Sequence, residues 1–163
     1  MKELVLVIGT LDTKGPEVAY VRDKLKEFGL NPYVIDVGIL GEPVGITPDF
    51  SKAQLAQFGG TTIEKVQNAG SRGAAVELMR EFVVKKVKEM VAQNEVIGAI
   101  GLGGAEGGVM TAAALMELPI GGRQTPARRK QNLQEADGAR ISPAAAQAAE
   151  RTPATCHRFE YRR

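Results

Sequence analysis

The residues most suited to chemistry follow the first apolar run of the chain, in the stretch Gly-Thr-Leu-Asp-Thr-Lys-Gly-Pro at 9–16. Free amides and the dipole at a helix start favour an anion such as phosphate. Lys14 would add a positive charge there, and Asp12 would either cap the helix or hold a magnesium ion through water. The candidate phosphate-binding residues of this turn are Gly9, Thr10, Asp12, Thr13, Lys14 and Gly15. The structural alternative is a capped helix with a solvated lysine. The order also differs from a Walker A loop, because Lys14 precedes the second glycine.

Two further groups of candidate binding residues lie at the end of the second apolar run and just before a long helical pattern. Asp36 closes a second apolar run, about where an acid of a doubly wound fold accepts a hydrogen bond from a ribose hydroxyl. The alternative is an aspartate that pairs with loop amides. Ser71, Arg72 and Gly73 precede a long helical pattern, and an arginine at that place can grip two phosphate oxygens. The alternative for Arg72 is an ion pair with a loop carboxylate.

A glycine-rich turn follows a third apolar run, in the stretch Gly-Leu-Gly-Gly-Ala-Glu-Gly-Gly at 101–108. Glycines allow a backbone to approach a ligand closely, so the candidate binding residues here are Gly101, Gly103, Gly104 and Gly107. This pattern is not the GxGxxG of a dinucleotide site. Glu106 is expected to cap the following helix or to coordinate a metal, of which capping is the simpler hypothesis. Since the carboxyl ends of parallel strands share one edge, this turn and the turn at 9–16 can hold one nucleotide.

These motifs, in this order, resemble the N-terminal domain of the family typified by the tomato mosaic virus resistance protein. The resemblance rests on residues 9–15, 36–43, 70–73 and 101–104, and it extends over about residues 1–120. It implies an ATP-binding, Rossmann-like α/β unit, so the expected ligand is ATP, alone or with magnesium. It implies no reaction, so catalytic residues stay unknown and enzyme activity stays open.

The elements that must position these groups follow from hydrophobic spacing. Apolar runs predict strands at 4–8, 32–37 and 95–101. Helical spacing predicts a helix with Pro16 in its first turn and Gly29 as its stop, and a long helix after residue 73 whose apolar stripe is core. A short helix is expected from a Ser51 cap through residue 57, and another helix through residue 118. The glycine- and proline-rich loop at 38–50 is expected to be a lid or a partner surface. Together they predict a three-layer α/β, Rossmann-like unit with a mainly parallel sheet, truncated at its C-terminal edge.

Composition divides the chain after residue 120. Residues 121–163 carry nine basic and four acidic residues, no valine, and the only cysteine and histidine, Cys156 and His157. Low hydrophobicity with one sign of charge predicts a tail that is disordered or non-native sequence, and a nucleic-acid arm is the less favoured interpretation. The domain at 1–120 is then expected to be an incomplete part of a longer two-domain protein, exposing an unpaired sheet edge that promotes self-association.

Composition and motifs also limit the classes of function expected for the chain. No apolar segment approaches the length that spans a bilayer and no secretory leader is seen, so a cytoplasmic protein without a membrane partner is expected, and no residue is assigned as a direct metal ligand. The body has no histidine or cysteine, and no pair of residues has a spacing that demands catalysis. The first hypothesis is an ATP-binding domain that forms a homo-oligomer. The alternatives are one half of an enzyme site for a phosphorylated or nucleotide substrate, and an interaction module that binds no nucleotide.

Overall fold

The computed structural model describes residues 3–93 and 95–119, which form an α/β unit around a parallel sheet. The central strand β1 (Leu4–Gly9) pairs with β2 (Asn31–Asp36) on one side and with β3 (Val96–Leu102) on the other. The helices are α1 (Leu11–Glu27), α2 (Lys52–Phe58), α3 (Ile63–Gln67), α4 (Arg72–Ala92) and α5 (Ala105–Leu115). The predicted α/β, Rossmann-like fold with a parallel sheet is confirmed.

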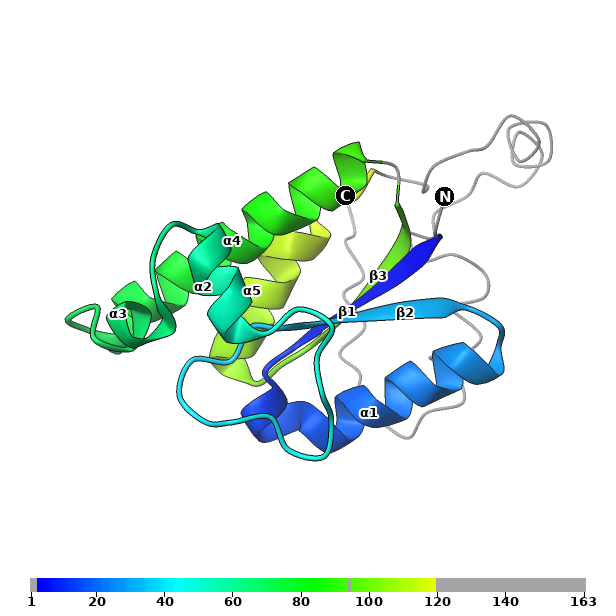
Figure 1. Cartoon of the computed structure of the whole chain (residues 1–163), viewed down its shortest axis with the longest axis horizontal. Helices are drawn as coiled ribbons and strands as arrows, with labels where there is room; N and C mark the ends of the chain where they lie inside the picture. The colour runs from blue at the N-terminus through cyan, green and yellow to red at the C-terminus, as the bar shows by residue number, and fades with distance from the viewer. Residues whose placement is uncertain (1–2, 94, 120–163) are drawn as a thin grey trace.

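The helices cover the sheet from both sides (Figure 1). Helix α1 lies against one face, whereas α4 and α5 lie together against the other. The strand order β2-β1-β3 requires the chain to cross over β1 between β2 and β3, and α4 lies on that crossover. All three strands are parallel, so the loops that follow them emerge at one end of the sheet.

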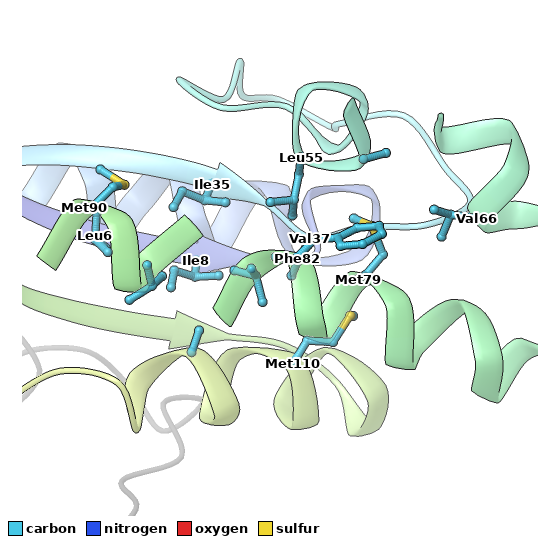
Figure 2. Close-up of a cluster of buried hydrophobic side chains, with 14 of the residues drawn as sticks. Leu6, Ile8, Ile35, Val37, Leu55, Val66, Met79, Phe82, Met90 and Met110 are labelled. Atoms are coloured by element: carbon cyan, nitrogen blue, oxygen red, sulfur yellow. The ribbon is translucent and has the colours of Figure 1, made fainter. Parts of the chain in front are cut away.

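The central strand β1 is buried on both faces because it is apolar at every position before its final glycine. All six residues of β1 are buried. Leu6 and Ile8 belong to the cluster with Met79, Val83 and Met110 from α4 and α5, part of which Figure 2 shows. Alternate residues of β1 pack against α1 on the opposite face. This two-sided packing explains why the strand reads as a continuous apolar run.

Helix ends match the expected signals in most places. The Ser51 side chain accepts a hydrogen bond from the Gln54 amide, and the Gln54 side chain accepts one from the Ser51 amide, which completes a capping box. Gly29 follows α1 with φ of 73°, as a helix stop requires. Helix α1 starts earlier than expected, and Lys14 interrupts it with φ of −123° and ψ of 15°. Pro16 therefore lies at the start of the regular part of this helix.

One helix of the structure was not predicted, and one predicted segment lies outside the described residues. The short helix α3 was not expected, because it is only five residues long and follows a glycine-rich turn. The predicted tail at 121–163, with Cys156 and His157, lies outside the described residues. Within the part that is described, none of the helices has the length and apolar character needed to cross a membrane.

Candidate functional site

Three loops meet where the strands end. A Cβ atom built on Gly107, in the first turn of α5, would lie 2.9 Å from Thr10 Cγ2, so the loop after β1 touches the start of α5. The Leu11 amide donates to Asp36 Oδ1 at 3.2 Å, which joins the loop after β1 to the end of β2. Figure 1 shows the starts of α1 and α5 at the same end of the sheet. Residues predicted from separate motifs thus share one edge.

Asp36 is the most deeply buried charged side chain of this edge, with 1% of its surface exposed. Its Oδ1 accepts hydrogen bonds from the Leu11 amide and, at 2.8 Å, from the Gly38 amide. No described residue donates a hydrogen bond to its Oδ2, although that oxygen is buried. Burial raises the pKa of the Asp36 carboxyl above its usual 3.8, against the opposing effects of the two amides and of Lys52. The two amide contacts fit the alternative that Asp36 pairs with loop amides. They leave Oδ2 without a donor among the described residues.

Residues 40–45, which we call the strap, lie across the start of α1. The Gly41 amide donates to Asp12 Oδ2 at 3.3 Å, and the Val44 amide donates to the Leu11 carbonyl at 3.0 Å. A Cβ atom on Gly15 would lie 1.9 Å from the Val44 carbonyl oxygen, so only glycine permits this approach. Asp12 and Gly15 therefore hold the strap against α1 in this structure.

Lys52 was not among the residues that the sequence singled out. Its side chain is only 7% exposed, and its Nζ donates to the Gly41 carbonyl and lies 3.1 Å from Glu42 Oε1. Lys52 is the first residue of α2, where the helix dipole disfavours a positive charge. A lysine in this unfavourable position is the feature of the sequence that could have indicated a specific contact for Lys52.

The other polar residues of the first turn contact one another or their own helix. Thr10 Oγ1 and Thr13 Oγ1 lie 3.0 Å apart. Lys14 Nζ donates to Glu17 Oε1 at 2.8 Å, and this hydrogen bond lowers the pKa of the Glu17 carboxyl. Lys14 and Glu17 are both partly exposed, so their ion pair contributes little to stability.

Arg72 connects the start of α4 to the start of α5. Its Nε lies 2.6 Å from Glu106 Oε1 and donates to Glu106 Oε2 at 2.8 Å. Arg72 is 73% exposed along its side chain, so solvent screens this pair. Ser71 Oγ accepts from the Ala74 amide at 3.1 Å and so caps α4. Glu106 forms this ion pair in the first turn of α5, and no side chain of the described residues caps that helix, so the prediction that Glu106 is a cap is wrong.

The start of α5 differs from the starts of the other described helices. Its N-cap is Gly104, which has no side chain to accept from the first amides. Side chains accept from amides at the starts of α2, α3 and α4, and Asp36 accepts from the first amide of α1. A Cβ atom on Gly103 would lie 2.3 Å from the Gly107 carbonyl carbon, which keeps this turn tight. The amino end of α5 is therefore the most available anion-binding end of the described helices.

The remaining glycines of the predicted site have packing roles or open surroundings. A Cβ atom on Gly9 would lie 2.8 Å from Val18 Cγ2, and one on Gly101 would lie 2.8 Å from Thr111 Cβ. The only neighbour that a Cβ atom on Gly73 would meet is Ser71 Oγ, at 4.0 Å. A surface hollow of about 310 Å³ lies elsewhere, along α4 beside Arg80 and Lys88. The strand-end edge, and not that hollow, gathers the polar groups.

The strand-end edge gathers groups that can contact a charged ligand. It combines helix-start amides, three carboxylates and three cations, from Asp12, Asp36, Glu106, Lys14, Lys52 and Arg72. Within residues 3–93 and 95–119, no three histidine, cysteine or acidic side chains are grouped as a metal site.

Comparison with known proteins identifies the family. The model of the uncharacterised protein family UPF0261, N-terminal domain, matches residues 3–122. The chain belongs to this family. A UPF0261 protein of Clostridium tetani is 35% identical over 121 residues, which are 74% of this chain and 30% of that protein. One from Brucella suis is 36% identical over 117 residues, 72% of this chain and 28% of that protein. The chain thus spans less than a third of the length of these relatives.

These matches correct the resemblance inferred from the motifs. The predicted membership of the tomato mosaic virus resistance family is wrong, because the matching family model and the relatives are all UPF0261 and indicate no ATP-binding family. The motifs at 9–15, 36–43, 70–73 and 101–104 all fall inside the matched region and so belong to a UPF0261 domain. The description of this family as uncharacterised names no ligand for the strand-end edge.

Proposed function

We propose that this UPF0261 domain binds a phosphate-bearing ligand at the amino end of α5, with a nucleotide such as ATP as the first candidate. The observation that carries the proposal is the glycine N-cap of α5, which leaves the first amides of that helix without a side-chain acceptor. Such amides, together with the helix dipole, favour phosphate oxygens.

The surroundings of this helix start support the same ligand class. Thr10 lies against Gly107 and carries a hydroxyl close to the first turn of α5. Arg72 reaches the same turn of α5 and already contacts an anionic group there, the carboxylate of Glu106. A bound phosphate would compete with Glu106 for the Arg72 guanidinium, which suits bidentate contact with phosphate oxygens.

The base and sugar of a nucleotide would extend along the strand ends toward α1. In this proposal Asp36 contacts a ribose hydroxyl through its free Oδ2, and Asp12 holds magnesium through water. Lys14 is a further phosphate contact once it leaves Glu17. Self-association and a cytoplasmic location remain predictions from the sequence.

Titration calorimetry of the 163-residue chain with ATP and magnesium tests the proposal, with GTP and inorganic phosphate as further ligands. We expect saturable binding that Arg72→Ala weakens about 10- to 100-fold, since a charge-assisted contact contributes about 1.5–3 kcal/mol. Arg80→Ala is the matched control. Like Arg72, Arg80 lies on α4 and pairs with a glutamate, but it lies away from the strand ends.

The two arginine variants separate a phosphate contact from a general effect of charge. Equal loss of affinity in Arg72→Ala and Arg80→Ala would show that only overall charge matters. Absence of binding by every ligand in a folded sample would refute the proposal and favour an interaction module.

A further inference from the structure

We propose that the strap is a lid on the Asp36 side of the strand-end site and that Lys52 is the latch that holds it closed. The inference that the lid admits a ligand rests on the proposed function, whereas the latch itself does not. The sequence predicted that the longer loop at 38–50, which includes the strap, is a lid or a partner surface, and it assigned no role to Lys52.

The strap has firm ends and a loosely held middle. Ile39 packs against one core cluster, and Ile46 is buried in the other. Between them, Leu40 is 66% exposed and Val44 is 52% exposed. Because its large apolar side chains face solvent, the strap gains little from burial, and polar contacts must hold its middle against α1.

The polar contacts that hold the strap converge on Gly41 and Val44. Asp12 accepts from the Gly41 amide, Leu11 accepts from the Val44 amide, and the Lys52 ammonium binds the Gly41 carbonyl. Lys52 is the one charged donor among them, and it reaches the strap from a buried position on α2. The Asp12 carboxylate is the other charged partner, but its hydrogen bond from the Gly41 amide is long at 3.3 Å, so the shorter charge-assisted bond from Lys52 contributes most to closure.

Asp36 lies beside this contact region, since its Oδ1 accepts from the Leu11 and Gly38 amides, and it carries a cost of its own. Its Oδ2 is buried without a donor among the described residues, and such an oxygen loses its hydration without compensation. Opening the strap and the adjoining loop would let water or a ligand hydroxyl donate to that oxygen. The closed state therefore combines a local latch with a local penalty, which is the balance expected of a lid that opens.

Hydrogen exchange followed by NMR on the whole chain, without ligand, tests the latch. We expect Lys52→Met to speed exchange of the Gly41 and Val44 amides about 10- to 100-fold, whereas amides within β1 and α4 keep their rates. Lys52→Arg restores a cation and should recover much of the protection. Glu42→Gln is the matched control, because Glu42 is 86% exposed and its pair with Lys52 should matter little.

The outcomes distinguish a latch from a lysine that has no effect on the strap and from a lysine that supports the whole fold. Unchanged exchange of the strap amides in Lys52→Met would overturn the proposal. Equal acceleration in β1 and α4 would overturn it too, since Lys52 would then support the whole fold. Faster strap exchange in a protein that binds no ATP, GTP or phosphate would uphold the latch while the proposed function fails.

Discussion

The contact between Gly107 and Thr10 makes the strand-end site a packed unit, and one methyl group tests it. In Gly107→Ala the new Cβ would lie 2.9 Å from Thr10 Cγ2 and 3.2 Å from Thr10 Oγ1. Thr10 is 9% exposed, and its Oγ1 also lies 3.0 Å from Thr13 Oγ1, so the side chain has little room to turn away. The start of α5 and the loop after β1 must then move apart by a few tenths of an ångström.

The size of the effect follows from two opposing contributions. Overpacking at a tight contact costs about 1–3 kcal/mol. Replacing glycine by alanine in a helix returns up to about 1 kcal/mol. Gly107→Ala should therefore lower the free energy of unfolding by about 0–2 kcal/mol. Gly108→Ala is the matched control, because a Cβ atom at Gly108 meets nothing within 4 Å and should gain about 0.5–1 kcal/mol.

Urea denaturation of both variants and the parent chain measures the difference directly. We expect Gly107→Ala to be less stable than Gly108→Ala by about 1–3 kcal/mol, or at least about 4 °C in Tm. Equal stability of the two variants would refute the reasoning, since Thr10 would then not pack against the first turn of α5. Phosphate affinity should fall in Gly107→Ala alone if that turn holds the ligand.

Two further predictions concern the start of α1. Gly15→Ala places a Cβ atom 1.9 Å from the Val44 carbonyl oxygen, so we expect the free energy of unfolding to fall by about 1–3 kcal/mol and the Val44 amide to exchange faster; unchanged urea midpoints would contradict this. Burial raises the pKa of Asp36 above 3.8, so its contribution to stability is full below about pH 4 and is lost as pH rises through the raised value. Urea titrations between about pH 4 and pH 7 should therefore show a declining stability difference between the parent chain and Asp36→Asn, and a rising difference would refute the shift.

The fold was predictable because its signals are local. A continuous apolar run predicted β1, helical spacing with Pro16 and Gly29 predicted most of α1, and Ser51 predicted the cap of α2. These residues act on neighbours within a few positions, which a sequence displays directly. The start of α1 was missed because its first turn is broken at Lys14 and held by the strap.

The sequence predicted which loops form the candidate site, but not which of their residues contact one another. The turns at 9–16 and 101–108 were predicted to share one edge of the sheet, and they do, but pairing between loops depends on distances that spacing does not contain. Arg72 meets Glu106 across 34 positions, and Asp12 meets Gly41 across 29. Lys52 was missed for the same reason, since its partners lie on the strap.

The pairings explain how one edge can hold both acids and an anion-binding helix start. Asp36 accepts from the first amide of α1, Lys14 pairs with Glu17, and Arg72 pairs with Glu106. Asp36 therefore takes the place of an anion at α1, so an external anion has better access at α5. A phosphate that binds there must displace Glu106 from Arg72, and this competition should weaken affinity relative to a site without the glutamate. The same competition makes binding sensitive to the charge of the ligand, because a more highly charged phosphate group displaces the carboxylate more effectively.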